Sequence, residues 1–135
     1  MDTPAYLRED RRSFMDMAAR RILIVDDNVE LAENIAEILQ MDGYETDVAA
    51  SAEEALPKAM RSVPDVVVTD YRLPGINGAL FVRQFRERHL GVYAVVISAY
   101  TDDLTIKEAT DAGAMFIPKP IDFRVLMRLV REAKA

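Results

Sequence analysis

Five polar residues of types that do chemistry come at or just after the ends of short apolar runs. They are three carboxylates, a hydroxyl and an ammonium: Asp26, Asp27, Asp70, Ser98 and Lys119. Carboxylates that gather without a cation repel one another and raise one another's pKa. Oxygen ligands without histidine or cysteine suit a hard divalent ion such as Mg²⁺. If the fold brings these side chains together, the sequence predicts a Mg²⁺ site.

The same residues are suited to handling a phosphoryl group. A metal ion and the Lys119 ammonium would offset charge on the equatorial oxygens of a transferring phosphoryl group, and the Ser98 hydroxyl would donate a hydrogen bond to one. Asp70 ends an apolar run and precedes a turn, which places its carboxylate to attack as a nucleophile. The sequence has no glycine-rich phosphate loop, so we do not expect the donor to be a nucleotide bound in such a loop.

Each of these residues also has an ordinary structural explanation when it is taken alone. An Asp or Ser that follows a strand often caps the next helix, and a lone Lys in a loop is usually solvated. We favour the chemical interpretation because all five residues follow strands that would end at one edge of one sheet.

Short apolar runs alternate with stretches of helical periodicity along the chain. The expected strands are Ile22–Val25, Thr46–Ala49, Val66–Asp70, Val92–Ser98 and Met115–Ile117. The expected helices contain Leu31–Leu39, start at Ser51, span about Ala79–Arg88 and Asp102–Ala112, and start at Asp122. The second of these helices has the Ser51 and Glu54 spacing of a capping box. Pro57 lies inside it and should remove a hydrogen bond or kink the helix.

Five strands that alternate with five helices predict an α/β fold, a doubly wound five-stranded parallel sheet with helices on both faces. Strands buried on both faces read as continuous apolar runs, as these do. In a parallel sheet the carboxyl ends of the strands share one edge, and ligands bind there where the strand order reverses. In the order 2-1-3-4-5 the first and third strands are neighbours, which would bring Asp26 and Asp27 beside Asp70.

The composition narrows the class of protein. Half of the 135 residues are hydrophobic and 30% are charged, which is typical of one globular domain with a sizeable core. The net charge of −6 argues against broad binding of nucleic acid. Cysteine is absent and there is one histidine, which excludes disulfides and thiolate metal sites and nearly excludes catalytic triads.

The sequence has no apolar run of about 18 residues that would predict a membrane span. Its N-terminus has no hydrophobic centre of the kind found in a secretory signal, and these two observations favour the cytoplasm. We interpret residues 1–20 as an N-terminal extension or linker and residues 21–135 as the domain. The mixed charges of the extension favour a disordered tail over a short docking helix.

The stretches ILIVDDN, VVVTDYRLPGING, VVISAY and FIPKPI, in this order, resemble the receiver domain of bacterial response regulators. The resemblance runs from about Arg21 to Ala135, nearly the whole chain outside the extension. It implies a flavodoxin-like fold and two-component signalling, in which Asp70 accepts a phosphoryl group from a phosphohistidine. The donor would be a sensor histidine kinase or a histidine phosphotransfer protein.

The resemblance also implies which residues bind the metal and the phosphoryl group. Mg²⁺ would be bound by Asp27, Asp70 and the main-chain carbonyl of Arg72, with Asp26 acting through a water molecule. Lys119 would pair with the phosphoryl group, and Ser98 would hydrogen-bond to it. The peptide bond from Lys119 to Pro120 would be cis, an isomer that is affordable only before proline.

Two further pairs of residues follow from the resemblance. Ser98 and Phe116 take the positions of a switch, in which the hydroxyl moves toward the phosphoryl group and the aromatic ring turns inward behind it. Phe116 has no hydroxyl for the hydrogen bond that a Tyr would make there. Arg72 and Tyr100 take positions that flank the phosphoryl group, and their bulk predicts slow self-dephosphorylation by restricting the access of water.

Phosphorylation would change a surface formed by the fourth helix, fifth strand and fifth helix, roughly Asp102 to Ala135, which would bind an unknown downstream protein. The chain would be a stand-alone regulator or a receiver excised from a hybrid histidine kinase or longer regulator. It would be a monomer or a phosphorylation-dependent dimer. We expect this domain to bind neither nucleic acid nor membrane directly.

Two functions of other classes remain. A Mg²⁺-dependent phosphatase with an Asp nucleophile usually needs a second carboxylate two residues after the nucleophile, where this sequence has Arg72. A flavin- or cobalamin-binding module would need a phosphate loop rich in Ser, Thr and Gly or a ligand histidine near a glycine loop, and the sequence has neither. We therefore expect a phosphoryl acceptor rather than an enzyme.

Overall fold

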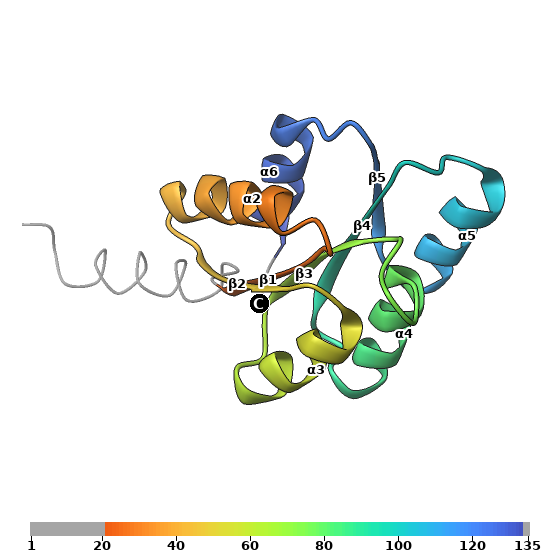
Figure 1. Ribbon diagram of the computed structural model, residues 1–135, viewed down its shortest axis with the longest axis horizontal. Coiled ribbons are helices and arrows are strands. Elements are labelled where there is room, and N and C mark those ends of the chain that lie inside the picture. The colour runs from red at the N-terminus through yellow and green to blue at the C-terminus, as the bar shows by residue number, and fades with distance from the viewer. Residues whose placement is uncertain (1–20, 134–135) are drawn as a thin grey trace, which may run out of the picture.

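The computed structural model describes residues 21–133, which form five strands and five helices in strict alternation (Figure 1). The strands are β1 (Arg21–Val25), β2 (Glu45–Ala49), β3 (Val66–Asp70), β4 (Tyr93–Ser98) and β5 (Met115–Pro118). The helices are α2 (Val29–Met41), α3 (Ala52–Arg61), α4 (Gly78–Arg88), α5 (Asp103–Asp111) and α6 (Phe123–Glu132). The predicted alternation is confirmed, and several element ends differ from the expected ones by a single residue.

The five strands form one sheet in the order β2-β1-β3-β4-β5, and every neighbouring pair is parallel. The predicted strand order is therefore confirmed. The chain moves outward from β1 to β2, then returns past β1 to β3, so the strand order reverses between β1 and β3. Doubly wound sheets bind ligands outside the carboxyl ends of the strands at such a point.

Helices cover both faces of the sheet, with α2 and α6 on one face and α3, α4 and α5 on the other (Figure 1). The residues of β1 alternate between the two cores that result: Ile22 and Ile24 pack with α2 and α6, whereas Leu23 and Val25 pack with α3 and α4. This period of two is the side-chain period of a strand, and both faces are apolar because both are buried.

Each helix begins next to the carboxyl end of a strand and is capped by a polar side chain that accepts a hydrogen bond from a backbone N–H of its first turn. The capping residues are Asn28, Ser51, Asn77, Asp102 and Asp122. At Ser51 the predicted capping box is present, because the Glu54 carboxylate also accepts a hydrogen bond from the N–H of Ala50. Each cap determines the residue at which its helix begins, and so the length of the loop that carries the polar residues after the preceding strand.

Pro57 is exposed and lies inside α3, and the helix continues past it to Arg61. Its missing N–H removes one helical hydrogen bond, as predicted from the sequence. Among the helices of residues 21–133, none is both long enough and apolar enough to cross a membrane. The predicted extension, residues 1–20, lies outside the described residues, and the boundary at residue 21 stays a prediction.

Candidate functional site

Three carboxylates meet at the carboxyl edge of the sheet, where the strand order reverses. Asp26 and Asp27 follow β1, Asp70 ends β3, and one oxygen from each of the three side chains lies within 4.8 Å of the other two. Asp26 and Asp70 are buried, with 5% and 8% of their surface exposed, whereas Asp27 is exposed. The cluster is therefore a partly open acidic site that solvent or a ligand can reach at Asp27.

Backbone hydrogen bonds carry the sheet one residue past the ends of β1 and β5, at two residues of the site. The N–H of Asp26 donates to the Ala49 carbonyl at 3.0 Å. The N–H of Lys119 donates to the Ser98 carbonyl at 2.8 Å. Asp26 and Lys119 therefore extend the hydrogen-bonding pattern of the parallel sheet.

Lys119 brings a positive charge to the cluster from the far side of β4. Its ammonium nitrogen Nζ lies 3.1 Å from Oδ1 of Asp70, and the Asp70 side chain is only 9% exposed. The peptide bond from Lys119 to Pro120 is cis, as predicted. Lys119 therefore pairs with the one carboxylate of the cluster that the sequence identified as a nucleophile.

The pKa values of two of the carboxyls reflect this environment. Burial raises the pKa of the Asp70 carboxyl, and the hydrogen bond and charge of Lys119 offset part of the rise. Burial also raises the pKa of the Asp26 carboxyl, against the opposing effect of a hydrogen bond that it accepts from the Asn28 N–H at 2.9 Å. The negative charge of Asp70 raises the pKa of Asp26 further. A cation held among these groups would remove the repulsion between them.

The donor set of the cluster fits Mg²⁺. All of its candidate ligand atoms are carboxylate oxygens, which suit a small hard cation that keeps several of its water molecules. The exposed side of the cluster leaves room for those waters. Whether the carbonyl of Arg72 joins the ligands and whether Asp26 acts through a water remain predictions.

Ser98 ends β4 beside the acidic cluster. The register of β3 and β4 pairs Asp70 with Ile97, so Ser98 lies one residue further toward the site edge. Its side chain is buried at 1% exposure, and its oxygen accepts a hydrogen bond from the N–H of Tyr100 at 2.9 Å. The hydroxyl is thus held by the loop that follows β4, and a shift of this loop would change its direction.

Arg72 and Tyr100 contact each other next to the site. The Arg72 guanidinium donates a hydrogen bond to the Tyr100 hydroxyl, and the guanidinium carbon lies 5.4 Å from the centroid of the Tyr100 ring. Both side chains are exposed. The sequence predicted that these residues flank the same group, and it did not predict that they join into one bridge between the loops after β3 and β4.

Phe116 lies on β5, partly buried, and packs against the core on the side of α3, α4 and α5. The register of β4 and β5 pairs it with Val96, two residues before Ser98. The predicted switch pair therefore occupies neighbouring strands, and its movement stays a prediction.

Two residues that position the site were not singled out from the sequence as doing so. Asn28 caps α2 and also donates its N–H to Asp26, and the Asp-Asp-Asn sequence before a helical pattern is the signal that could have revealed it. Gly78, the first residue of α4, lies so close to the end of β3 that a Cβ there would be 2.1 Å from the Asp70 carbonyl oxygen. Nothing local in the sequence indicates that approach.

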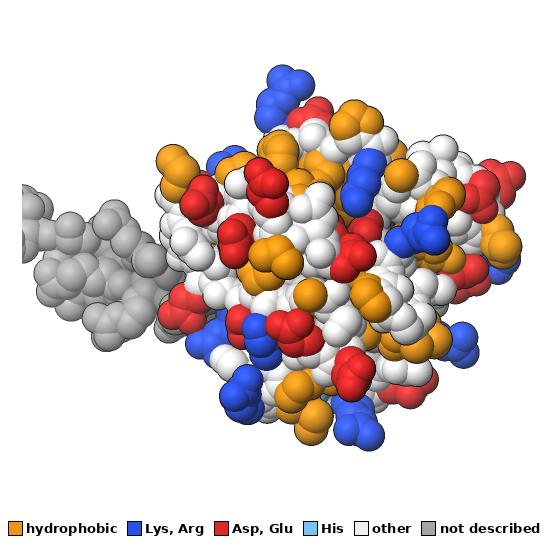
Figure 2. Space-filling view, viewed as in Figure 1, with side chains coloured by type: hydrophobic (Ala, Val, Ile, Leu, Met, Phe, Trp, Pro, Cys, Tyr) orange, Lys and Arg blue, Asp and Glu red, His pale blue; other side chains and the backbone are white. Residues whose placement is uncertain are grey.

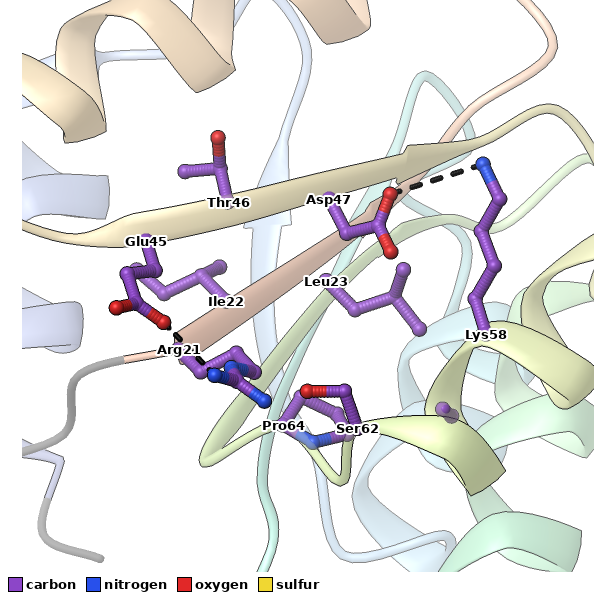
Figure 3. Close-up of a pocket in the computed structure, with 10 residues that line it drawn as sticks. Arg21, Ile22, Leu23, Glu45, Thr46, Asp47, Lys58, Ser62 and Pro64 are labelled. Carbon is purple, nitrogen blue, oxygen red and sulfur yellow. Dashed lines mark hydrogen bonds and ion pairs between the residues drawn. The ribbon is translucent and has the colours of Figure 1, made fainter.

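A hollow of about 220 Å³ lies elsewhere, toward the amino ends of β1 and β2 (Figure 3). Its charged walls are already paired, with Arg21 2.8 Å from Glu45 and Lys58 3.6 Å from Asp47. None of the predicted site residues lines it, so we assign it no part in the site.

The fold and this group of side chains define a class of protein, a doubly wound parallel sheet that carries acidic residues and a lysine at its carboxyl edge. The family described as "Response regulator receiver domain" matches residues 22–131. The chain belongs to the response regulator receiver domain family, as the motifs of the sequence indicated.

Relatives with curated descriptions agree with this membership. The chain is 41% identical over 103 residues to a response regulator receiver protein of Anaeromyxobacter sp., and the match covers 76% of this chain and 43% of that protein. The chain spans about half the length of the curated relatives that it matches first. The shared part is therefore the receiver domain itself.

Solved structures confirm the flavodoxin-like fold. A CheY-like response regulator receiver domain protein from Methanospirillum hungatei has a TM-score of 0.80 and 28% identity, with 85% of this chain and 93% of that chain covered. The CheX-CheY-BeF3-Mg²⁺ complex from Borrelia burgdorferi has a TM-score of 0.76 and 28% identity, with 84% of this chain and 87% of that chain covered.

Proposed function

We propose that this receiver domain accepts a phosphoryl group on Asp70 in a Mg²⁺-dependent transfer from a phosphohistidine. The observation that carries the proposal is the position of Asp70, whose carboxylate lies 3.1 Å from Lys119 and beside Asp26 and Asp27. The donor would be a sensor histidine kinase or a histidine phosphotransfer protein of a two-component system in the cytoplasm.

In the proposed transfer a carboxylate oxygen of Asp70 forms a bond to phosphorus while the bond from phosphorus to the donor imidazole nitrogen breaks. The imidazole leaves with the electron pair of that bond and takes up a proton. Asp70 thereby becomes an acyl phosphate. For this attack Asp70 must be ionised. The charge of Lys119 favours the ionised form, because it offsets part of the rise in the carboxyl pKa that burial causes.

Lys119 and Ser98 would act on the phosphoryl group once it is attached. The Lys119 ammonium would leave its pairing with the Asp70 carboxylate and neutralise one phosphoryl oxygen, and the Ser98 hydroxyl would donate to another. To donate this bond, the Ser98 O–H must point toward the phosphoryl group. The oxygen of the same hydroxyl accepts a hydrogen bond from the Tyr100 N–H in the unmodified protein. The two residues would thus bind different oxygens of one phosphoryl group.

Mg²⁺ would be held by Asp27, by Asp70 and by the main-chain carbonyl of Arg72, with Asp26 acting through water. When bound, the ion supplies charge neutralisation for the acidic cluster and for the incoming phosphoryl oxygens. The all-oxygen donor set supports this assignment. The Borrelia complex, which contains CheY, BeF3 and Mg²⁺, gives it further support by similarity.

The phosphorylated site would act on the surface made by α5, β5 and α6, through Ser98 and the aromatic ring of Phe116. Two large apolar side chains are exposed on this surface, Leu104 at 66% and Met115 at 45%. Such side chains suit contact with a downstream protein or with a second copy of the domain. The face shown in Figure 2 mixes acidic and basic side chains, which suits a protein partner better than nucleic acid.

The bridge between Arg72 and Tyr100 would set the lifetime of the phosphoryl group. Water must reach the phosphorus of phospho-Asp70 for hydrolysis, and the two side chains join the loop that follows Asp70 to the loop that follows the neighbouring strand β4. We infer slow self-dephosphorylation from this. The domain would therefore act as a stoichiometric acceptor that is phosphorylated once, rather than as an enzyme that turns over.

Chemical mapping of the phosphorylated residue tests the proposal. After incubation with acetyl phosphate and Mg²⁺, reduction with borohydride converts an aspartyl phosphate into homoserine, which mass spectrometry of peptides locates. We expect homoserine at residue 70 and at no other Asp. Homoserine at Asp26 or Asp27, with residue 70 unchanged, would contradict the assignment.

A further inference from the structure

The residue that follows the acceptor reaches across the site edge to α5. The Tyr71 hydroxyl donates a hydrogen bond to Oε2 of Glu108 at 2.8 Å, and the side-chain amide of Asn77 approaches the same oxygen at 3.4 Å. Tyr71 is the first residue after β3, Asn77 caps α4, and Glu108 is on α5. The Glu108 carboxylate on α5 thus accepts two hydrogen bonds from the segment between β3 and α4.

The backbone of Tyr71 is fixed on both sides. Its N–H donates to the Ile97 carbonyl at 2.7 Å, and its carbonyl accepts from the N–H of Gly78 at 2.7 Å. Tyr71 is therefore coupled to β4 and to the first residue of α4, and a shift of the backbone at Asp70 would change these two hydrogen bonds together with the direction of the Tyr71 side chain.

The hydrogen bond from Tyr71 to Glu108 lies in a partly buried place that strengthens it. Tyr71, Asn77 and Glu108 are all partly buried, and a hydrogen bond to a carboxylate is stronger where water is partly excluded. Burial and the bond to Glu108 raise the pKa of the Tyr71 hydroxyl, which keeps its proton at neutral pH. The donor therefore stays a donor under ordinary conditions.

The helix that receives this bond is only shallowly anchored by apolar contacts. Of the residues in α5, Thr105 and Ala109 are the buried ones, and Thr105 uses its hydroxyl on the cap, Asp102, at 2.8 Å. The side chains of Lys107 and Thr110 bond within the helix, Lys107 to Asp111 at 2.8 Å and Thr110 to the Ile106 carbonyl at 3.0 Å. A polar tie to a neighbouring element therefore contributes a larger share of the anchoring here than it would in a helix with a wide buried face.

We propose that Tyr71 is a positioning residue that holds α5 through Glu108 in the unmodified protein and releases it when Asp70 is modified. The proposal rests on the proposed phosphorylation of Asp70 and adds a route that is separate from Ser98 and Phe116. The new charge and bulk at Asp70 shift the adjoining backbone, the Tyr71 hydroxyl leaves Glu108, and α5 becomes free to adopt another position.

Hydrogen exchange of residues 103–111 in the full chain tests this inference. The variants are Tyr71→Phe, which removes the donor, Glu108→Ala, which removes the acceptor, and Glu108→Gln, which retains an acceptor oxygen. Lys107→Gln is the control, because it breaks an exposed ion pair within the same helix. Each protein is measured alone and with Mg²⁺ and beryllofluoride, and labelling by acetyl phosphate is measured in parallel for the wild type and the Glu108 variants.

Without activator we expect Tyr71→Phe and Glu108→Ala to speed exchange in α5 roughly tenfold, the size expected for one lost hydrogen bond to a charged group. Lys107→Gln should stay near wild type, and Glu108→Gln should lie between wild type and Glu108→Ala, because its amide oxygen still accepts the hydrogen bond but carries no charge. Activator should speed exchange in wild-type α5 and change it little in Tyr71→Phe, where the helix is already released. Labelling should be unaffected in the Glu108 variants, which lie outside the acceptor site.

The inference is overturned if Tyr71→Phe and Glu108→Ala exchange like wild type, or if Glu108→Gln behaves like Glu108→Ala. It is also overturned if α5 responds to activator equally in Tyr71→Phe and wild type. A wild type that takes up no phosphate contradicts the proposed function instead. The two failures are distinguishable. If only the inference fails, the protein is labelled normally, while hydrogen exchange in α5 does not depend on Tyr71.

Discussion

The ammonium of Lys119 lies 3.1 Å from a carboxylate oxygen of Asp70, although Asp70 ends β3, Lys119 follows β5, and these strands are not neighbours in the sheet. The strand between them, β4, ends in the small side chain of Ser98, so the longer Lys119 side chain can reach past it. The pair joins β3 to β5 across the carboxyl edge. The domain therefore has a charge contact that any group attached to Asp70 must break or replace.

Removing the ammonium should raise the pKa of the Asp70 carboxyl. Lys119 opposes the effect of burial through its hydrogen bond and its charge, so Lys119→Met removes the largest contributions that hold the pKa down. Titration of the labelled carboxyl carbon by NMR, without metal, should show Asp70 holding its proton to higher pH than in wild type. We also expect the variant to accept phosphate without the change in α5 and β5. An unchanged or lowered pKa would argue against the pairing.

Asp26→Asn should stabilise the metal-free protein at neutral pH. The asparagine oxygen can still accept the Asn28 N–H, and the substitution removes a buried charge that Asp70 repels. Each unit by which the folded state raises this pKa is worth about 1.4 kcal/mol at neutral pH. Urea unfolding in the presence of a chelator would measure the difference.

The sign of the pH dependence follows from the raised pKa. In the folded state Asp26 holds its proton to higher pH than in the unfolded state, so ionisation weakens the fold as pH rises through the raised value. Below the ordinary value of 3.8 the carboxyl is neutral in both states and the penalty is gone. The advantage of Asp26→Asn should therefore shrink as pH falls from 7 toward acid. An advantage that grows as pH falls would contradict this account.

Mg²⁺ should stabilise the protein through Asp27. A ligand that binds only the folded state adds about 2.7 kcal/mol at a concentration of 100 times its Kd. Thermal unfolding with increasing Mg²⁺ should show this gain in wild type and little of it in Asp27→Asn. Glu37→Gln, which changes an exposed acid further along α2, is the matched control and should respond like wild type. If Asp27→Asn responds as strongly as Glu37→Gln does, the ion binds elsewhere.

Disrupting the bridge between Arg72 and Tyr100 should shorten the life of phospho-Asp70. We expect Arg72→Ala and Tyr100→Ala each to speed hydrolysis roughly tenfold, or about 1.4 kcal/mol of barrier. Because the two side chains contact each other, the double variant should lose less than the sum of the two effects. The decay of radiolabelled protein gives the rates. A half-life of seconds in wild type would show that the bridge does not shield the site.

The sheet, its strand order and the acidic cluster follow from local patterns in the sequence. The apolar runs mark strands buried on both faces, and polar residues at their ends must then meet at one edge. The position of Lys119 at the same edge as Asp70 also follows, because parallel strands bring their carboxyl ends together. These features were predictable because each depends on the period of the pattern and on topology.

Contacts between distant loops could not be predicted in the same way. The hydrogen bond from Tyr71 to Glu108 and the approach of Gly78 to the Asp70 carbonyl depend on the exact angle at which α4 and α5 lie on the sheet. A helix can rotate by a fraction of a turn without changing its apolar pattern, so the pattern does not determine which polar side chains meet across it. The roles of Ser98, Phe116 and the Arg72 carbonyl stay predictions.

The central claim, that Asp70 accepts the phosphoryl group, is tested most directly by intact mass spectrometry after incubation with acetyl phosphate and Mg²⁺. Wild type should gain the mass of one phosphoryl group, and the gain should disappear when a chelator removes Mg²⁺. Asp70→Asn, which keeps the shape of the side chain and loses the nucleophilic carboxylate, should gain nothing. Equal labelling of wild type and Asp70→Asn would contradict the account.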